Sequence, residues 1–452
     1  MKKRLLENVK VLDLSYKGHA VATHPEDKRE IHILGAVPGD LLDIEIYKRV
    51  KDIYYADPVK IKKESSCRTA PREGEVYKST SPWQIFKFDC ENKYKKDLVE
   101  KFFKEHADTN LETEIFFPGG FDIYNYRNKI EYGFWRDREN GKYSFSFFKR
   151  GSSRGKIPVL ESALNHQKIN KVGKIFLDLI NQKNIDFGVL KYLILRYSYF
   201  EDKVVAHLII QKDDFEALRV GARELEVTLQ AHARLIKGLK VSYSPPETPG
   251  ARVEKDFLEL GDLTLKEKVA GKIFEYGLEH FFQVYVPLFD FVIDDMKSVL
   301  LKLQKERSEK WTKMLDFFAG VGLFGIALSD FAKKAEAVEV SEGTKYFAEK
   351  NAQNAGLKNY KFIETDTDNA LESLKNTDLL ILDPPRAGVP KDTIKAILQE
   401  KPETIIYLSC NPKTQAMDYN WLKRDYKIIF NKAYNLFPRT PHVENLVVLK
   451  RG

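Results

Sequence analysis

One cysteine near the end of the chain has neighbours that favour catalysis over packing. Cys410 lies in the run Ser409-Cys410-Asn411-Pro412, directly after the apolar run TIIYLS. A cysteine at the end of a buried strand is usually either an inert packing residue or a nucleophile. Pro412 and the residues after it suit the start of a helix, and the dipole and free amide groups of a helix N-terminus stabilise a thiolate. The sequence therefore predicts that Cys410 is a nucleophile.

Two carboxylates are expected beside this thiol. Asp383 follows the apolar run LLIL and precedes two prolines, which make its loop rigid. Glu444 begins the last apolar run of the chain, and a closing strand there would lie beside the strand that ends at Cys410. Glu444 alone could be a surface charge at a strand start, and His442 is an alternative base. We favour Glu444 because a carboxylate can accept a proton at neutral pH without a partner that sets its tautomer.

A thiolate and a base together suit methyl transfer to C5 of uracil. C5 is too weak a nucleophile to take a methyl group directly. When a thiolate adds at C6, the ring becomes an enolate with electron density at C5, and C5 then attacks a sulfonium methyl group. A base removes the C5 proton, and the thiolate is eliminated. In this chemistry Cys410 would be the nucleophile and Glu444 the base.

A glycine-rich turn predicts a nucleotide-like cofactor. Gly320, Gly322 and Gly325 follow the apolar run MLDFF and match GxGxxG, a dinucleotide fingerprint. Glu339, at the end of the next apolar run, is placed to accept hydrogen bonds from a ribose diol, which both NAD and S-adenosylmethionine carry. Asp366 either receives an adenine amino group or caps a helix. The glycines alone do not decide between the two cofactors.

The acidic loop at Asp383 argues for the second cofactor. It would project into the crevice opposite the glycine turn, and hydride transfer has no evident use for it. An NAD-dependent oxidoreductase would also leave Cys410 and Glu444 without roles. A non-catalytic RNA-binding protein is another alternative, although the intact SCNP and HVE segments argue against it. A DNA cytosine methyltransferase usually has its nucleophile in a Pro-Cys context, and an adenine-N6 enzyme needs an aromatic residue where Arg386 stands.

The 452-residue chain is long enough for two or three domains, and its local pattern changes twice. Residues 1–62 alternate short β-rich runs with turns, which predicts a small antiparallel barrel of a kind that often binds nucleic acid. Residues 63–280 hold a helix at about 92–107, expected to pack on the catalytic domain, and aromatic β-rich runs that predict an α+β domain with a central antiparallel sheet. Residues 281–452 alternate strands with helices, which predicts a doubly wound, Rossmann-like α/β domain with a final antiparallel pair.

Basic and aromatic residues are interleaved in the predicted central sheet. Arg127, Lys129, Lys149 and Arg150 lie among tyrosines and phenylalanines, a pattern that suits phosphate contacts and base stacking. The solvated face of an ordinary sheet has the same pattern. The net charge of +8 suits a polyanionic partner, but 74 basic against 66 acidic residues also fit a mixed surface.

The composition predicts a cytoplasmic protein. Hydrophobic residues make up 43% and charged residues 31% of the chain, no apolar run is long enough to cross a bilayer, and the N-terminus has no secretory signal. Cys67, Cys90 and Cys410 are far apart in the sequence, which fits a reducing compartment and argues against a disulfide framework.

Four segments, taken in order, resemble the signatures of RNA uracil-C5 methyltransferases: DFFAGVGLFG, LDPPRAG, LSCNP and FPRTPHVE. The segment around Gly18 and AVPGD is similar to a TRAM domain, the RNA-binding barrel common in that family, and NYRNKIEY and FFKRGS resemble its central motifs. The resemblance implies S-adenosylmethionine as methyl donor, 5-methyluridine as product, and either tRNA or large-subunit ribosomal RNA as partner. We expect a monomer with no membrane partner.

The resemblance also implies residue roles. Cys410 would be the nucleophile, Glu444 the proton acceptor, and Asp383 a contact to both the base and the methyl donor. The implied cofactor site consists of Gln283, Phe318, Gly320, Gly322, Leu323, Glu339, Asp366 and Asp383. Tyr285 stands where the family usually has Asn, so we assign it no role.

Metal binding is a further departure from the family. Many of its members hold an iron–sulfur cluster with four cysteines in the region after the barrel. This chain has only Cys67 and Cys90 there, so we expect no cluster and no other metal, and we interpret both cysteines as remnants or packing residues.

Overall fold

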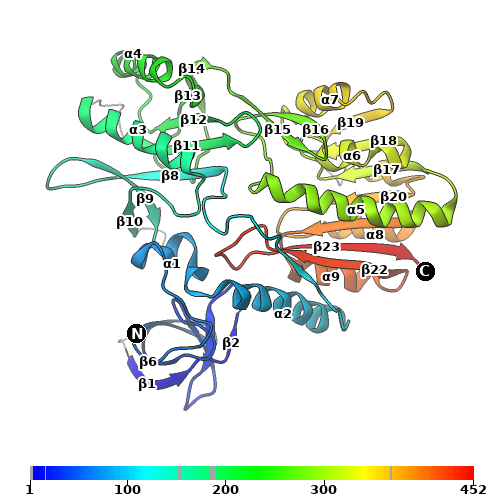
Figure 1. Cartoon of the computed structure of the whole chain (residues 1–452), viewed down its shortest axis with the longest axis horizontal. Helices are drawn as coiled ribbons and strands as arrows, with labels where there is room; N and C mark the ends of the chain where they lie inside the picture. Colours follow the sequence, from blue (N-terminus) through cyan, green and yellow to red (C-terminus); the bar gives the residue numbers. More distant parts are fainter. Residues whose placement is uncertain (1–3, 16, 151–154, 184–189, 367–368) are drawn as a thin grey trace.

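The computed structural model describes residues 4–15, 17–150, 155–183, 190–366 and 369–452. Three large sheets follow one another along the chain, and Figure 1 shows them around a common junction. The N-terminal barrel lies below the central sheet, and the catalytic sheet lies beside both. The loop between the last two strands reaches from the catalytic sheet toward this junction (Figure 1).

The first six strands form a small barrel in the order β1-β5-β6-β4-β3-β2; the predicted antiparallel pairing holds except between β4 and β6, which are parallel. They are β1 (Arg4–Lys10), β2 (Asp13–Leu14), β3 (Ala20–Thr23), β4 (Glu30–Ile33), β5 (Leu41–Val50) and β6 (Ile53–Lys63). Alternate residues of β5, namely Leu42, Ile44 and Ile46, are buried because one face of the strand covers the core. Strands β4 and β6 pair in parallel, which sets His32 opposite Tyr55.

A helical linker follows the barrel. It consists of η1 (Gly74–Val76), α1 (Tyr77–Thr80), η2 (Pro82–Ile85) and α2 (Phe88–Ala107). A disulfide joins Cys67, before the linker, to Cys90 in the first turn of α2. The expectation of no disulfide was wrong, because the chain between these cysteines folds back and brings together two residues that are 23 positions apart. Cys410 is the remaining cysteine of the chain and is free.

The central sheet has seven strands in the order β10-β9-β8-β11-β12-β13-β14. They are β8 (Lys129–Arg136), β9 (Tyr143–Phe148), β10 (Lys156–Val159), β11 (Leu190–Ser198), β12 (Lys203–Ile210), β13 (Ile236–Tyr243) and β14 (Lys255–Gly261). All neighbours are antiparallel except β12 and β13, which are parallel because helix α4 (Phe215–Ala231) connects them. Helix α3 (Gln167–Lys183) packs on this sheet, and a hairpin of β15 (Thr264–Val269) and β16 (Lys272–Gly277) leads to the catalytic part.

The catalytic sheet has eight strands in the order β19-β18-β17-β20-β21-β23-β22-β7. They are β7 (Ile115–Phe116), β17 (Trp311–Phe317), β18 (Ala332–Glu339), β19 (Tyr360–Glu364), β20 (Leu379–Leu382), β21 (Thr404–Ser409), β22 (Tyr426–Tyr434) and β23 (Glu444–Arg451). Its helices are α5 (Val286–Arg307), α6 (Leu323–Ala327), η3 (Ser329–Phe331), α7 (Thr344–Asn354), η4 (Leu371–Leu374), α8 (Lys391–Glu400) and α9 (Pro412–Leu422). The strand order reverses between β17 and β20, which is where doubly wound sheets bind their ligands.

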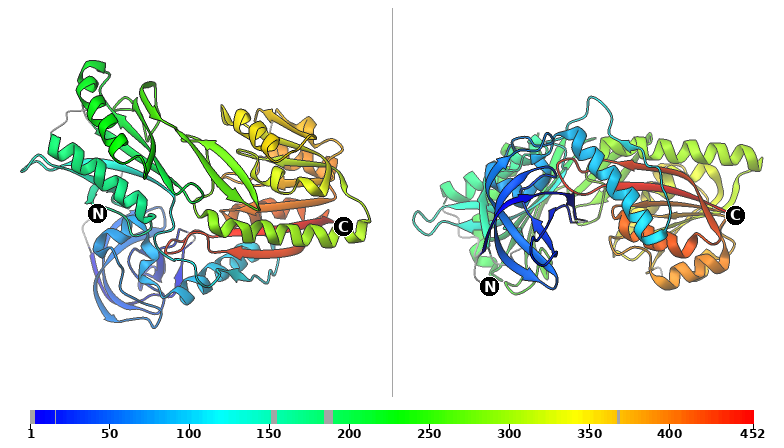
Figure 2. Two further views of the ribbon diagram at one scale, coloured as in Figure 1. Left: turned by 45° about the horizontal axis from the view of Figure 1, so that its top comes forward. Right: turned by 90° about the horizontal axis from the view of Figure 1, so that it is seen from below.

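Helix α2 connects the barrel to the catalytic sheet. It begins at Phe88, four residues before the predicted start, and packs against α9. Val99 and Phe103 on its inner face are fully buried, and the Phe103 ring lies 6.0 Å from that of Tyr419. The view from below in Figure 2 shows α2 crossing from the barrel to the catalytic sheet. No helix of the described residues is long and apolar enough to cross a membrane.

Candidate active site

Three predicted catalytic side chains meet at one edge of the catalytic sheet because their strands end there. Strand β21 pairs antiparallel with β23, and Ser409 lies opposite Asn445. The next residues along this register, Cys410 and Glu444, therefore also face each other. Strand β20 runs parallel to β21 and ends one residue before Asp383. The edge thus carries one thiol and two carboxyl groups.

Burial controls the protonation of the two carboxyl groups. Glu444 is 5% exposed, and its Oε2 has no hydrogen-bond partner among the described residues. Burial, followed by the charge of Asp383, raises the pKa of Glu444 well above its usual value. Burial also raises the pKa of Asp383 to about 7, although a hydrogen bond from Gln283 opposes the shift. Near neutral pH the pair therefore holds at least one proton, and Glu444 is a stronger base than an exposed glutamate.

The thiol of Cys410 is protonated at neutral pH. Burial raises its pKa to about 12, the charges of Glu444 and Asp383 add to the shift, and the Arg386 guanidinium opposes it. Helix α9 begins at Pro412, as predicted, but the expected activation of the thiol by this helix is outweighed by burial and by the carboxyl groups. Cys410 must therefore lose its proton during a reaction.

His442, the alternative base, lies at the same edge. Its Nε2 is 3.3 Å from Nη2 of Arg386. Burial, followed by the positive charge of Arg386, lowers the pKa of His442 to about 3. A group with so low a pKa is a weak base. The electrostatics of the site thus favour Glu444 over His442 as proton acceptor.

A buried network from α2 fixes the loop that leads to Glu444. The Glu91 carboxylate accepts the backbone N–H of Arg439 at 3.0 and 3.1 Å and forms an ion pair with Lys95 at 2.9 Å. Lys95 Nζ donates to Asn435 Oδ1 at 2.5 Å, and Asn435 Nδ2 donates back to Glu91 Oε1 at 3.0 Å. Glu91, Lys95 and Asn435 are fully buried, and Arg439 is 6% exposed. Because moving the loop would break several of these buried bonds at once, the network strongly resists movement of the loop.

The glycine turn after β17 needs its glycines. Gly320 and Gly322 have φ values of 51° and 86°, in the left-handed region. A Cβ on Gly322 would lie 2.6 Å from the Tyr360 hydroxyl and 2.9 Å from Cδ1 of Ile326. A Cβ on Gly320 would meet no atom within 4 Å. Gly322 therefore permits close packing, whereas Gly320 faces open space in which a ligand can approach the backbone.

A crevice beside this turn brings most of the predicted cofactor residues together. Its walls are formed by Phe281, Phe282, Gln283, Phe318, Ala319, Gly320, Val321, Leu323, Phe324 and Asp383. Glu339 borders it, because its Oε2 accepts the Gly320 N–H at 3.0 Å and retains capacity for another donor. The wall residues include a carboxyl group and neither lysine nor arginine. The crevice therefore suits a cationic ligand better than the pyrophosphate of a dinucleotide.

Asp366 is not among the wall residues of this crevice. Its Oδ1 accepts the backbone N–H of Asn369 at 2.8 Å, and its Oδ2 accepts Nδ2 of the same residue at 2.7 Å. These bonds occupy both oxygens of the Asp366 carboxylate, which favours the structural interpretation of Asp366 over a role in adenine binding.

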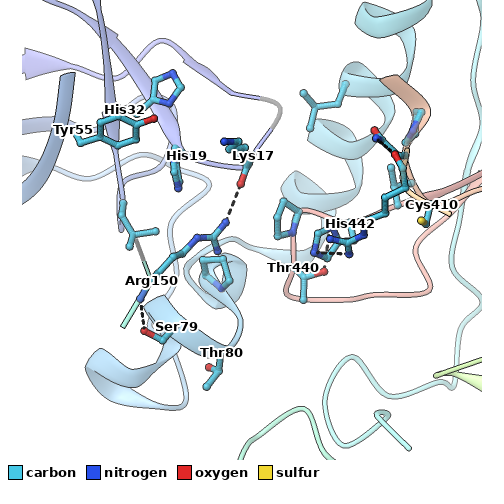
Figure 3. Close-up of a pocket in the computed structure, with 18 of the residues that line it drawn as sticks. Lys17, His19, His32, Tyr55, Ser79, Thr80, Arg150, Cys410, Thr440 and His442 are labelled. Carbon is cyan, nitrogen blue, oxygen red and sulfur yellow. Dashed lines mark hydrogen bonds between the residues drawn. The ribbon is translucent and has the colours of Figure 1, made fainter. Parts of the chain in front are cut away.

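A second cavity, of about 740 Å³, lies above Cys410 and extends to the barrel (Figure 3). Its lining consists of Lys17, His19, His32, Leu34, Tyr47, Lys48, Val50, Tyr55, Ser79, Thr80, Pro82, Leu98, Phe102, Arg127, Arg150, Arg386, Cys410, Asn411, Pro412, Thr440, Pro441, His442 and Val443. Of the predicted RNA-binding residues, Arg127 and Arg150 are part of it. Lys129 instead forms an ion pair with Glu131 at 3.0 Å, and Lys149 is exposed outside the lining.

Several residues of this site were not predicted from the sequence. Arg386 was used only to argue against an adenine-N6 methyltransferase and was assigned no role in the site. His19 and His32 were not identified as site residues. The available signal was strand alternation, because the basic and aromatic residues of β5 and β6 include Lys48 and Tyr55, which line the cavity. That alternation does not show which face of the barrel lies toward Cys410.

A doubly wound sheet with a glycine turn, an acidic loop and a thiol at its ligand-binding edge defines a Rossmann-like methyltransferase. The model of the tRNA (uracil-5-)-methyltransferase family matches residues 87–452, and the chain belongs to this family of RNA-methylating enzymes.

Known relatives span the whole chain. An uncharacterized RNA methyltransferase of Lactobacillus johnsonii is 25% identical over 466 residues, covering 100% of this chain and 99% of the relative. One of Thermotoga maritima is also 25% identical, over 99% of this chain and 100% of the relative. The crystal structure of the Pyrococcus abyssi tRNA (uracil-54, C5)-methyltransferase with S-adenosyl-L-homocysteine has a TM-score of 0.75 at 21% identity, covering 98% of this chain and 100% of that one. The fold is therefore shared over its full length.

Proposed function

We propose that this enzyme methylates C5 of a uridine in tRNA, using Cys410 as covalent nucleophile, Glu444 as base and S-adenosylmethionine as methyl donor. The observation that carries the proposal is the meeting of Cys410, Glu444 and Asp383 at one sheet edge, below a basic cavity. The family description supports tRNA as substrate, and large-subunit ribosomal RNA is the alternative.

The residue types around the crevice beside the glycine turn suit the methyl donor. S-adenosylmethionine, when bound, supplies a methyl group on a positively charged sulfonium. The crevice has a carboxyl group at Asp383, aromatic walls such as Phe318, and open space before Gly320. Glu339 Oε2 can accept a ribose hydroxyl in addition to the Gly320 N–H. Gln283, which is hydrogen-bonded to Asp383, holds the acidic loop against this crevice.

Cys410, which lines the larger cavity, and the carboxyl groups of Asp383 and Glu444 beside it account for the chemistry on the base. As the Cys410 Sγ bonds to C6 of uracil, its proton passes to the Asp383 carboxylate, and the C5=C6 electron pair moves toward O4. After C5 has taken the methyl group, Glu444 removes the C5 proton. The electrons of that C–H bond restore C5=C6, the C6–Sγ bond breaks, and the thiolate recovers its proton from Asp383. The step requires both carboxyl groups to be ionised at the start, so the proton that the buried pair holds near neutral pH must leave first. The raised pKa then makes ionised Glu444 a strong base for a carbon-bound proton, and Glu444 releases that proton to solvent at the end of the cycle.

A target uracil must leave its stack to reach this thiol. Cys410 lies within the cavity rather than on a flat surface, and the catalytic edge is enclosed by the loop that contains Thr440 and His442 (Figure 3). Enzymes that act on a base generally extrude it into such a pocket, which is easier from a loop than from a duplex. The target is therefore a uridine in a loop.

Two experiments test the proposal. Mapping 5-methyluridine in total RNA from cells with and without the gene should show one uridine that loses its methyl group, and its position identifies the RNA. The Cys410→Ala enzyme should not restore that methyl group, yet the purified variant should still bind the RNA. Unchanged 5-methyluridine in the deletion strain, or methylation by Cys410→Ala, would refute the proposed reaction.

A further inference from the structure

The cavity above Cys410 is larger than one target base needs. At about 740 Å³ it exceeds the lower end of ligand pockets, which is about 300 Å³. Cys410 lies at one end of it, and barrel residues such as His19, His32 and Tyr55 lie at the other (Figure 3). The barrel end contains no group that the proposed methyl transfer uses. It is built from His19, His32, Tyr55, Lys48 and Arg150, together called the barrel subsite below.

The charge of the cavity suits a phosphodiester. Five cationic side chains line it, and its described lining residues include neither aspartate nor glutamate. Arg150 lies between the barrel and the central sheet, where its Nη2 donates to the Lys17 carbonyl at 2.9 Å and its backbone N–H donates to Ser79 Oγ at 3.2 Å. The ion pairs of the described residues do not include Arg150. A half-buried guanidinium held by a neutral acceptor has capacity for an anion such as a phosphate.

The rings of the barrel subsite suit a nucleobase. His32 and Tyr55 face each other across β4 and β6, with ring centroids 5.7 Å apart. His19 completes the cluster, 5.7 Å from the His32 ring and 6.2 Å from the Tyr55 ring. Burial and the nearby charge of Arg150 lower the pKa of His19 to about 4, so its ring is neutral at physiological pH. Aromatic faces beside a cation are the usual platform for an unstacked base.

We propose that the barrel subsite binds a second nucleotide of the same RNA, unstacked and near the target uridine, with its base against His19 and Tyr55 and its phosphate on Arg150. This inference rests on the proposed function, because it assumes that the target uracil occupies the Cys410 end. It assigns the barrel a part in selecting the site of methylation. The RNA would be held at two bases rather than one, and its loop would have to open at both.

The test measures equilibrium binding of unmodified tRNA transcripts and requires no turnover. Tyr55→Ala should weaken binding by about 5- to 150-fold, the range measured for loss of base stacking on an aromatic residue. Tyr54→Ala is the matched control, because Tyr54 is the preceding residue of β6 but donates a hydrogen bond to Asp27 and packs against the His24 ring, and it does not line the cavity. Transcripts with one abasic nucleotide at each position around the target should then reveal a single position at which the parent and Tyr55→Ala bind equally.

The Arg150→Gln variant tests the phosphate contact independently. It should reduce the slope of log Kd against log salt by about 0.7 to 0.9, the value for one phosphate. The proposal is overturned if Tyr54→Ala and Tyr55→Ala lose the same affinity, or if no single abasic position makes the parent and Tyr55→Ala bind equally. A failure of the methyl-transfer proposal would show differently, as a parent enzyme that binds tRNA yet forms no adduct with 5-fluorouridine RNA.

Discussion

Cys410 and Glu444 are close enough to interact electrostatically, and the register that pairs Ser409 with Asn445 sets them opposite each other where β21 ends and β23 begins. Side chains in opposite positions of an antiparallel pair have Cβ atoms about 4.5–5.5 Å apart, which places a thiol and a carboxyl group on either side of the same small space. The two groups act on different atoms of the uracil ring: the thiol must bond to C6, and the carboxylate must reach the proton on C5. A uracil ring between them meets both requirements.

Replacing Glu444 with glutamine should trap the reaction after methyl transfer. The amide cannot take the C5 proton, so the bond between Cys410 and C6 is not broken. A covalent protein–RNA adduct that survives denaturing gel electrophoresis is the expected result. The double variant Cys410→Ala/Glu444→Gln is the control and should form none. Normal turnover by Glu444→Gln would show that another group, such as His442, is the base.

Replacing Lys95 with methionine should destabilise the enzyme and impair catalysis. The variant removes the closer of two cationic partners of the buried Glu91 carboxylate and leaves Arg439 at 3.6 Å, so the loss should be up to about 3–5 kcal/mol of unfolding free energy. Lys96→Met is the matched control on the same helix, because Lys96 is 43% exposed and pairs only loosely with Glu100 at 3.7 Å. Its loss should cost about 1 kcal/mol or less in urea denaturation. Equal effects of both changes would argue against the buried network as the support of the loop before Glu444.

Replacing Asp383 with asparagine should stabilise the fold at high pH while it abolishes methylation. The pKa of Asp383 is raised from 3.8 to about 7 by burial, so the folded state holds this proton more tightly than the unfolded state. Its favourable contribution is complete below pH 3.8 and is lost as the pH rises through 7. The difference in Tm between Asp383→Asn and the parent should therefore shift in favour of the variant from pH 4 to pH 8.

The surface carboxylate of Asp392 gives the control for that pH dependence. It is 66% exposed, and hydrogen bonding to Lys395 lowers its pKa, so it is fully ionised above pH 6. Asp392→Asn should change Tm by a small amount that is constant between pH 6 and pH 8. A Tm difference for Asp383→Asn that did not depend on pH would contradict the raised pKa of that group.

The pairing of Cys67 with Cys90 predicts the thiol count of the oxidised enzyme. Unfolded in guanidinium without reductant, the parent should react with one equivalent of a thiol reagent, at Cys410. After reduction it should react with three. Cys67→Ser should expose two thiols under the first condition, since it frees Cys90. Three reactive thiols in the unreduced, air-oxidised parent would show that the bond does not form.

The sequence by itself determined the catalytic edge. Parallel strands of a doubly wound sheet end at the same edge, so an Asp, a Cys and a glycine turn placed directly after apolar runs had to converge. The closing strand runs antiparallel to its neighbour, so its first residue, Glu444, lies at the same edge. These relationships depend on the local sequence pattern and on the sheet topology, and the spacing of the apolar runs predicts both.

Tertiary structure decided the protonation of these groups and the residues that surround them. The sequence predicted an activated thiolate, but burial beside two carboxyl groups keeps Cys410 protonated. The disulfide between Cys67 and Cys90 and the network around Lys95 join segments whose proximity depends on how the linker folds back. The position of the barrel rings near Cys410 also depends on tertiary structure. Strand alternation separates the two faces of a strand, but it does not show which part of the protein each face packs against. Desolvation and contacts between distant segments arise only when the three sheets pack together.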